Sequence, residues 1–324
     1  MHDVISLRTR DADHSGSSSI EGTLQVRLDA GGEAVTASMA YRLSGRSGLP
    51  LVLVLGGLNS NRAIEQWWPE QLGPKGPLDS RRYRLLSVDW ACPQGRPERT
   101  LLTQDHAQAL EVLLKRHDIA RLHLLCGASY GAMVALALAE RGQLAIRRLL
   151  TISGAHYSHP VATAARYLQR EVVRLGAMAG FPTAGLNIAR GLAMNSYRTR
   201  ELFSERFPQA DAAERLDSIQ SYLSHVGNDF AARFSVERFL DLSESLDLHQ
   251  VNPQGIDCPA TVVAVDSDQL VPLSQMQALA GSLAGPTDFH CLQSPYGHDA
   301  FLKAHQAIAH VLNQCLEEKQ HATA

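Results

Sequence analysis

The feature that most constrains this chain is residues 124–133 (LLCGASYGAM), where a short apolar run leads into a G-x-S-x-G motif and then into a segment rich in alanine and leucine. This order predicts a buried strand, a tight turn and a helix. The turn must hold Ser129 in a strained backbone conformation with its hydroxyl projecting, and it needs small residues at Gly127 and Gly131 so that strand and helix can pass closely. Ser129 is therefore the candidate nucleophile. A glycine-flanked loop serine is the alternative, because the bare motif also occurs by chance.

The composition is that of an ordinary soluble globular protein. The 324 residues include 45% hydrophobic and 19% charged residues, and the net charge of −3 comes from acidic and basic residues mixed along the chain. The sequence therefore has no basic groove for nucleic acid and no polybasic membrane patch. We expect small-molecule partners, with no nucleic acid and no membrane.

The cysteines and histidines bear on the compartment and on metals. The cysteines are odd in number and widely spaced (Cys92, Cys126, Cys258, Cys291 and Cys315), which favours reduced thiols in a cytoplasmic protein. The histidines fall in no H-E-x-x-H motif and accompany no paired C-x-x-C motif, so we expect no metal site. Residues 1–10 lack the apolar core of a signal peptide, and no run reaches the ~18 apolar residues of a spanning helix.

Strand and helix patterns alternate along most of the chain. Residues 24–28 and 34–43 read as a hairpin, and 103–117, 272–283 and 300–316 read as helices. Further strands are expected at residues 51–55, 85–88, 124–128, 148–153, 259–265 and 288–292. The fold class is therefore α/β, with a mostly parallel central sheet flanked by helices on both faces.

Between His156 and Gln250 the alternation stops, and the sequence predicts helices only, with breaks near residues 180–182 and 207–208. We interpret residues 156–250 as an inserted helical cap, and residues 21–155 with 251–324 as the core domain. Residues 1–20 are polar and are expected to form a flexible N-terminal segment.

If Ser129 is the nucleophile, an acid should follow a later strand and a histidine the last one. His298 follows the last predicted strand and is the candidate general base. The acid is Asp266 or Asp268, both directly after the strand at residues 259–265. A loop aspartate that caps the next helix, and a loop histidine bonded to the backbone, are the structural alternatives.

An oxyanion hole requires two backbone N–H donors beside the nucleophile. Tyr130, the residue after Ser129, supplies the first. The glycines at 56–57 end the strand at residues 51–55, and Leu58 is the expected second donor.

Residues 127–133, 267–272 and 296–302 together resemble the homoserine O-acyltransferases of the α/β-hydrolase superfamily. Residues 66–68 are similar to the family's region after the oxyanion loop, and residues 185–198 resemble its substrate-binding helix. The resemblance runs from about residue 40 to residue 316, and it implies the α/β-hydrolase fold.

Carried over residue by residue, the resemblance implies the catalytic triad Ser129, Asp268 and His298. It also implies three homoserine contacts, Arg190, Tyr197 and Asp299. The chemistry of these residues agrees, since a guanidinium suits the carboxylate of an amino acid and a carboxylate suits its ammonium. Without the resemblance, Arg190 reads as a solvated helix arginine and Asp299 as a helix cap.

The reaction that the resemblance implies is acyl transfer from acyl-coenzyme A to L-homoserine through an acyl-enzyme, the first committed step of methionine biosynthesis. Acetyl-CoA is the preferred donor and succinyl-CoA a possible one. No permanently bound cofactor and no metal are expected, and relatives pair through their cap helices, so we expect a homodimer. The family's glycine-rich segment after residue 89 is shortened here to residues 90–97, which bears on the acyl pocket.

Three alternatives remain at this stage. The chain could be a serine esterase or thioesterase of the same fold, because the same triad transfers acyl groups to water when water is not excluded. It could transfer the acyl group to L-serine. It could also be a protein of hydrolase fold without catalytic activity.

Overall fold

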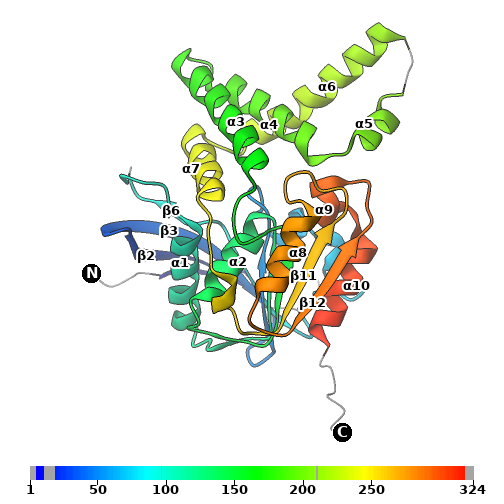
Figure 1. Ribbon diagram of the computed structural model, residues 1–324. Helices are drawn as coiled ribbons and strands as arrows, with labels where there is room; N and C mark the ends of the chain where they lie inside the picture. Colours follow the sequence, from blue (N-terminus) through cyan, green and yellow to red (C-terminus); the bar gives the residue numbers. More distant parts are fainter. Residues whose placement is uncertain (1–4, 11–18, 96, 209–210, 318–324) are drawn as a thin grey trace.

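The computed structural model describes residues 5–10, 19–95, 97–208 and 211–317, and its core is a single mixed sheet (Figure 1). Its strands lie side by side in the order β1 (Ile5–Arg10), β2 (Ser19–Ala30), β3 (Glu33–Ser44), β5 (Arg84–Val88), β4 (Leu51–Leu55), β8 (Leu124–Ala128), β10 (Leu149–Ile152), β11 (Ala260–Val265) and β12 (Thr287–Leu292). The pairs from β5 to β12 are parallel, and β1, β2 and β3 are joined antiparallel. β3 also pairs antiparallel with β5, and the two-residue β6 (Cys92–Pro93) pairs with β3.

The central parallel strands β4, β8, β10 and β11 are buried on both faces, as their continuous apolar runs predict, whereas the edge strand β12 is partly exposed. In β4, Leu53 and Leu55 belong to one core cluster, whereas Val52 and Val54 belong to the other. Residues of α1 (Thr103–Arg116), α2 (Tyr130–Glu140) and α8 (Leu273–Ser282) fill the first cluster. Residues of α9 (Ala300–Lys303) and α10 (His305–Leu316) fill the second. The α/β fold expected from the sequence is therefore confirmed.

Five helices stand between β10 and β11 in the chain: α3 (Pro160–Met178), α4 (Pro182–Tyr197), α5 (Arg200–Arg206), α6 (Ala212–Ala231) and α7 (Val236–Asp247). Figure 1 shows most of them projecting above the ends of the parallel strands. A separate apolar cluster, which includes Val173, Leu186, Phe230 and Phe239, packs α3, α4, α6 and α7 together. Leu242 and Leu246 of α7 instead join the main core, so α7 anchors this helical segment to the sheet.

The structure differs locally from two expectations. Within the N-terminal segment expected to be flexible, β1 pairs with β2 over residues 5–10 and β2 already begins at Ser19; residues 1–4 and 11–18 lie outside the described residues. A polar sequence suits an edge strand, which needs backbone partners on one side only.

The second concerns the closing helix, expected at residues 300–316, which is broken at Ala304 into α9 and α10. Phe301 O would accept a hydrogen bond from the amide of His305 in an unbroken helix. It accepts one from Trp68 Nε1 instead, at 2.6 Å, and Gln71 Nε2 donates to His305 O. The side chain of Trp68, from an earlier segment, thus takes the place of a helical hydrogen bond that local sequence patterns predict.

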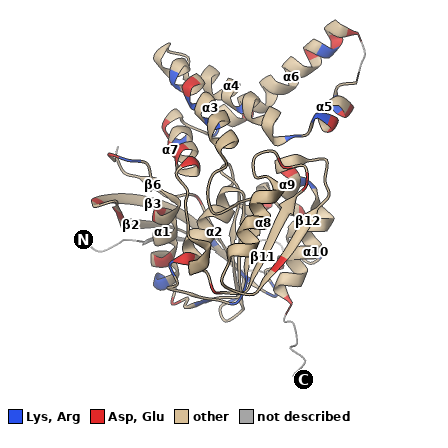
Figure 2. Cartoon of the chain, viewed as in Figure 1, with Lys and Arg blue, Asp and Glu red and all other residues tan. Residues whose placement is uncertain are grey.

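Two further features are the distribution of charged residues and the lengths and polarity of the helices. In the view of Figure 2, acidic and basic residues are interspersed over the helical segment and the core. In the part of the chain that the structure describes, no helix is both long enough and apolar enough to cross a membrane.

Candidate active site

Ser129 lies in the turn between β8 and α2, and its backbone angles are φ 53° and ψ −120°. This is the strained conformation that the motif predicts. A Cβ at Gly127 would lie 2.3 Å from Gly131 O, and a Cβ at Gly131 would lie 2.2 Å from Leu55 O. Strand and helix therefore pass too closely for any larger residue at these two positions, and the turn presents the serine at the carboxyl end of β8.

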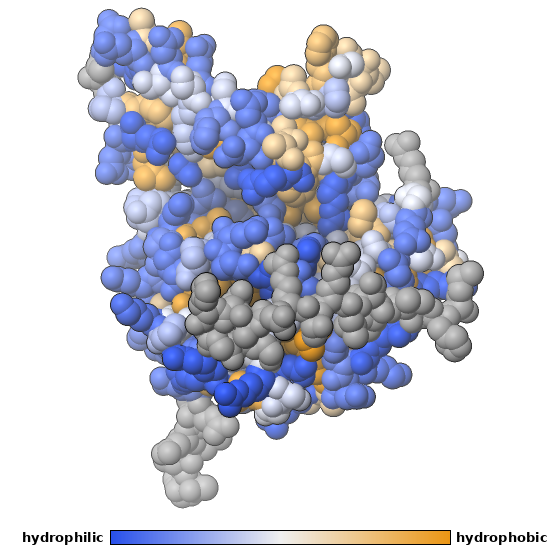
Figure 3. Space-filling model, turned by 180° about the vertical axis from the view of Figure 1, so that it is seen from behind, coloured by the Kyte–Doolittle hydropathy of each residue, from blue (hydrophilic) through white to orange (hydrophobic). Residues whose placement is uncertain are grey.

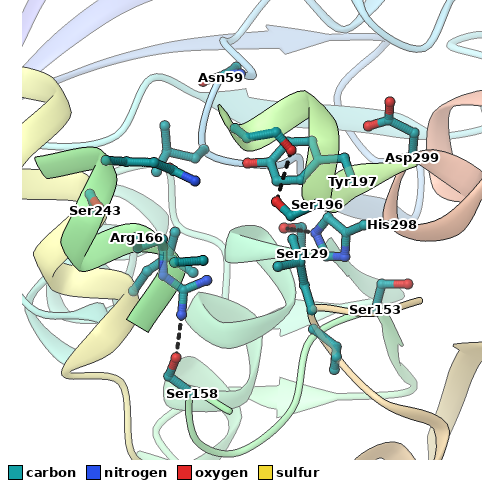
Figure 4. Close-up of a pocket in the computed structure, with 18 of the residues that line it drawn as sticks. Asn59, Ser129, Ser153, Ser158, Arg166, Ser196, Tyr197, Ser243, His298 and Asp299 are labelled. Atoms are coloured by element: carbon teal, nitrogen blue, oxygen red, sulfur yellow. Dashed lines mark hydrogen bonds between the residues drawn. The ribbon is translucent and has the colours of Figure 1, made fainter. Parts of the chain in front are cut away.

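Three loops at the same edge of the sheet bring Ser129, His298 and Asp268 together. Ser129 Oγ lies 2.8 Å from His298 Nε2, a contact drawn in Figure 4, and His298 Nδ1 lies 2.8 Å from Asp268 Oδ2. His298 is 6% exposed and Asp268 is 5% exposed. The three side chains thus form a continuous hydrogen-bonded relay, in which His298 and Asp268 are shielded from bulk water and Ser129 is half-buried.

The two candidate acids occupy different environments. Asp268 Oδ1 accepts hydrogen bonds from the amides of Leu270 and Val271, at 2.9 and 3.1 Å, which leaves Oδ2 directed to His298. Asp266 is exposed, and its Oδ1 accepts a hydrogen bond from the amide of Ser294. The geometry therefore places Asp268, and not Asp266, in the relay.

Opposing effects set the pKa of His298. Burial lowers it, because the charged imidazolium is poorly solvated, but the negative charge of Asp268 and its hydrogen bond raise it. The net pKa of His298 lies above the ordinary value of 6.5. The imidazole is thus a stronger base than a free histidine, as abstraction of a serine proton requires.

The two residues expected to supply oxyanion N–H groups both lie beside Ser129. Tyr130 is the first residue of α2, where a backbone N–H has no acceptor within the helix. A Cβ at Gly57 would lie 3.8 Å from Ser129 Cβ, and Leu58 lines the same pocket as Ser129. Trp90 links the two regions, because its Nε1 donates to Gly57 O and its ring packs against that of Tyr130.

The pocket above Ser129 is lined by all three residues expected to contact an amino acid: Arg190, Tyr197 and Asp299. The Arg190 guanidinium lies 5.5 Å from the ring centre of Tyr197 and 5.7 Å from that of Phe230. It forms no ion pair with any residue that the structure describes. The Tyr197 ring lies 5.4 Å from that of His298. Arg190 is therefore held by aromatic faces, with its charge available to a ligand.

Asp299 has a partner that the sequence did not indicate. Arg198 Nε donates to Asp299 Oδ2 at 3.2 Å. Asp299 nevertheless lines the pocket beside His298, and Figure 4 shows both on the same side of Ser129. A ligand cation that binds the Asp299 carboxylate would therefore be its second positively charged partner, beside Arg198.

Sequence reasoning missed a second arginine in the pocket, Arg166 on α3. Arg166 and Arg170 both bind Asp247 at the end of α7. The two arginines are four residues apart, which places them on one helix face. That spacing alone does not distinguish a buried pair from two solvated arginines.

None of the cysteines lines the pocket. Cys126 is buried in β8, and burial raises the pKa of its thiol, so it remains a neutral packing residue. All five cysteines are free. Within the described ranges, no group of three or more His, Cys, Asp or Glu side chains lies close enough to hold a metal ion.

Comparisons with known proteins agree with the fold and with the family that the sequence resembles. A family model described as the alpha/beta hydrolase fold matches residues 50–304. A homoserine O-succinyltransferase of Xanthomonas campestris pv. campestris is 38% identical, over 95% of this chain and 87% of that protein. A serine O-succinyltransferase of Frateuria aurantia is 30% identical, over 85% of this chain and 91% of that protein. The crystal structure of a homoserine O-acetyltransferase from Staphylococcus aureus superposes with a TM-score of 0.80 at 22% identity, covering 98% of this chain and 97% of that one.

Proposed function

Because the chain belongs to the homoserine O-acyltransferases of the alpha/beta hydrolase family, we propose that it transfers an acyl group from acyl-coenzyme A to the hydroxyl of L-homoserine. The observation that carries this proposal is the relay of Ser129, His298 and Asp268 in a pocket that also presents the guanidinium of Arg190, which forms no ion pair with a described residue. The relay can form an acyl-enzyme, and the arginine can hold the carboxylate of an amino acid.

In the first step, His298 Nε2 accepts the proton of Ser129 Oγ while the oxygen attacks the thioester carbonyl. The N–H groups of Leu58 and Tyr130 are proposed to stabilise the oxyanion. The carbon–sulfur bond then breaks, and His298 returns the proton to the leaving thiolate. The products are free coenzyme A and an ester on Ser129.

In the second step, homoserine takes the place of coenzyme A. Arg190 and Tyr197 bind its carboxylate end, and Asp299 binds its ammonium. His298 accepts the proton of the homoserine hydroxyl, whose oxygen attacks the ester carbonyl. The bond to Ser129 Oγ breaks, and the serine recovers its proton from His298.

Water is the competing acceptor, so transfer requires that homoserine be held at reacting distance while water is excluded. Oriented binding can contribute roughly 7 kcal/mol to such a step. The helices α3, α4 and α7 all supply pocket residues and cover Ser129. We therefore assign the helical segment at residues 156–250 the role of a cap that controls the acceptor.

The experiment that tests the function incubates the protein with acetyl-CoA or succinyl-CoA, with and without L-homoserine, and measures free thiol and O-acyl product. O-acylhomoserine formed only with homoserine supports the proposal. Thiol release at a rate unchanged by homoserine indicates an esterase or thioesterase. A parallel reaction with L-serine tests the other acceptor, because one relative acts on serine.

The raised pKa of His298 predicts the pH dependence. Only the neutral imidazole can accept the Ser129 proton, so kcat/KM for the acyl donor should rise with pH as His298 loses its proton. Since the folded pKa lies above 6.5, the midpoint of this rise should also lie above pH 6.5. A pH profile of thiol release in single-turnover reactions measures it. A midpoint at or below 6.5 would contradict the assignment.

Replacing Arg190 by alanine should impair the second step far more than the first. The loss of a charge-assisted hydrogen bond to the homoserine carboxylate should raise KM for homoserine by roughly 10- to 100-fold. The burst of thiol released by the donor alone, which reports acylation of Ser129, should stay close to that of the wild type. The KM of Arg190→Lys for homoserine should lie between those of the wild type and Arg190→Ala. Equal losses in both steps would argue against this contact.

Two further expectations remain proposals. Exposed apolar residues gather on the outer part of α3 and α4, where Leu175, Met178 and Phe181 are all more than half exposed (Figure 3). This face supports a homodimer formed through the cap, to be checked by the mass in solution. The free thiols fit the cytoplasmic location expected from the sequence.

A further inference from the structure

A positively charged cluster, which the proposed acceptor contacts do not use, lies beside the pocket and contributes one side chain to its lining. We call it the α3 arginine cluster, and it consists of Arg166, Arg170 and Asp247. Arg166 Nε lies 2.7 Å from Asp247 Oδ1, and Arg170 Nη1 lies 2.5 Å from Asp247 Oδ2. Arg170 also donates to Ser243, and Arg166 donates to Ser158.

The cluster carries one positive charge in excess. Its side chains are 13% (Arg166), 9% (Arg170) and 7% (Asp247) exposed, so water solvates them poorly. Two guanidinium groups share one carboxylate, and a buried charge without a partner is costly. A second anion in the pocket would balance the cluster.

Arg166 is the member placed to receive that anion. It lines the pocket with Ser129, whereas Arg170 does not. Its Nη1 has no hydrogen-bond partner among the residues that the structure describes. Figure 4 shows its guanidinium reaching into the pocket from the side opposite His298, with Ser129 between them. A group bonded to Ser129 therefore extends between a base on one side and a free cation edge on the other.

We propose that Arg166 binds the distal carboxylate of a succinyl group carried on Ser129, so that succinyl-CoA is the preferred donor. This inference rests on the proposed acyl-transfer function. The bonds made and broken are those of the two steps above, and the distal carboxylate stays unchanged throughout. An acetyl group carries no charge that could bind Arg166. The carboxylate of homoserine is not the missing anion either, because its proposed partner is Arg190.

The proposal reverses the preference for acetyl-CoA expected from the sequence. That expectation rested on how common acetyl donors are in the family, and no residue pattern supported it. The excess charge comes from α3 and α7, segments about eighty residues apart, and it becomes evident only when their side chains are seen together.

The test compares three donors at saturating homoserine: succinyl-CoA, acetyl-CoA and butyryl-CoA. Butyryl has the same number of carbons as succinyl and lacks the charge, which separates charge from size. In the wild type, kcat/KM should be highest for succinyl-CoA. In Arg166→Met, the ratio of succinyl to butyryl kcat/KM should fall by roughly 10- to 100-fold, as expected for the loss of a hydrogen bond between charged groups. Arg166→Lys should restore part of the ratio.

The matched control is Arg174→Met on the same helix. Arg174 is exposed, pairs with Glu171 and does not line the pocket, so this variant should keep the donor ratio of the wild type. Arg166→Met should fold, because Asp247 keeps Arg170 as a partner and no buried carboxylate is left alone. Two measurements on Arg166→Met check that it folds: its activity with butyryl-CoA and its thermal unfolding temperature, both of which should stay close to those of the wild type.

Two results would overturn the proposal. One is a wild type that prefers acetyl-CoA or butyryl-CoA to succinyl-CoA, and the other is an Arg166→Met variant that loses activity equally with all three donors. Both results leave acyl transfer to homoserine in place. Failure of the proposed function has a different signature, since no donor would then give an O-acylhomoserine.

Discussion

Replacing Ser129 by alanine is expected to lower acyl transfer from every donor by at least about 10⁴-fold, because removal of the nucleophile leaves only binding and oxyanion stabilisation. The hydroxyl sits 2.8 Å from His298 Nε2, and no other serine hydroxyl is within hydrogen-bonding distance of that nitrogen in the described part of the chain. Alanine tolerates the backbone at φ 53° about as well as serine does, so the fold should persist. Thiol release and O-acylhomoserine formation measure the effect.

Ser153 provides the control for this variant. It also has a positive φ, of 49°, and lies at the end of β10, next to β8 in the sheet. Its hydroxyl lines the same pocket as Ser129 but has no hydrogen bond to His298 or to any other described residue, so Ser153→Ala should leave the nucleophile in place and keep turnover within a few-fold of the wild type. A fluorophosphonate should label the wild type and Ser153→Ala but not Ser129→Ala. Unchanged turnover in Ser129→Ala, or labelling of that variant, would refute the nucleophile and leave a hydrolase fold without this chemistry.

The sequence was sufficient for the fold and the relay because both depend on local patterns with fixed places in the topology. Continuous apolar runs predict strands buried on both faces, and the carboxyl ends of parallel strands meet at one edge of the sheet. Residues that directly follow β8, β11 and β12 must therefore lie close together. This is why local patterns could name Ser129, His298 and an acid at either Asp266 or Asp268 before their distances were known.

The parts that the sequence did not predict depend on contacts between segments far apart in the chain. The choice between Asp266 and Asp268 follows from which carboxylate the amides of Leu270 and Val271 hold. The pairing of Arg198 with Asp299 joins the end of α4 to the loop after β12. The excess charge at Arg166 depends on α3 and α7 packing together. In each case the sequence shows the residue type but not the residue that it contacts in the fold.

The second large effect is expected for Asp268→Asn, which should lower kcat by about 10⁴-fold. Asparagine Oδ1 can still accept the amides of Leu270 and Val271, so the loop should keep its shape. Its NH₂ group then faces His298 Nδ1 and donates where the carboxylate accepted. His298 must present a bare Nδ1 to this group, and its proton then lies on Nε2, directed at Ser129. An imidazole in this tautomer cannot accept the serine proton.

The matched control for this variant is Asp266→Asn, two residues away in the same loop. Asp266 is exposed and outside the relay, so its amide variant should keep nearly full activity. The pH profile of Asp268→Asn adds a second test, because a residue with only a structural role would not change the pKa of His298. Loss of the Asp268 charge removes the main influence that raises the pKa of His298, so the acidic limb of the residual activity should move to lower pH. If Asp266→Asn is instead the inactive variant, or if the limb does not move, then Asp268 is not the group that orients and charges the catalytic imidazole.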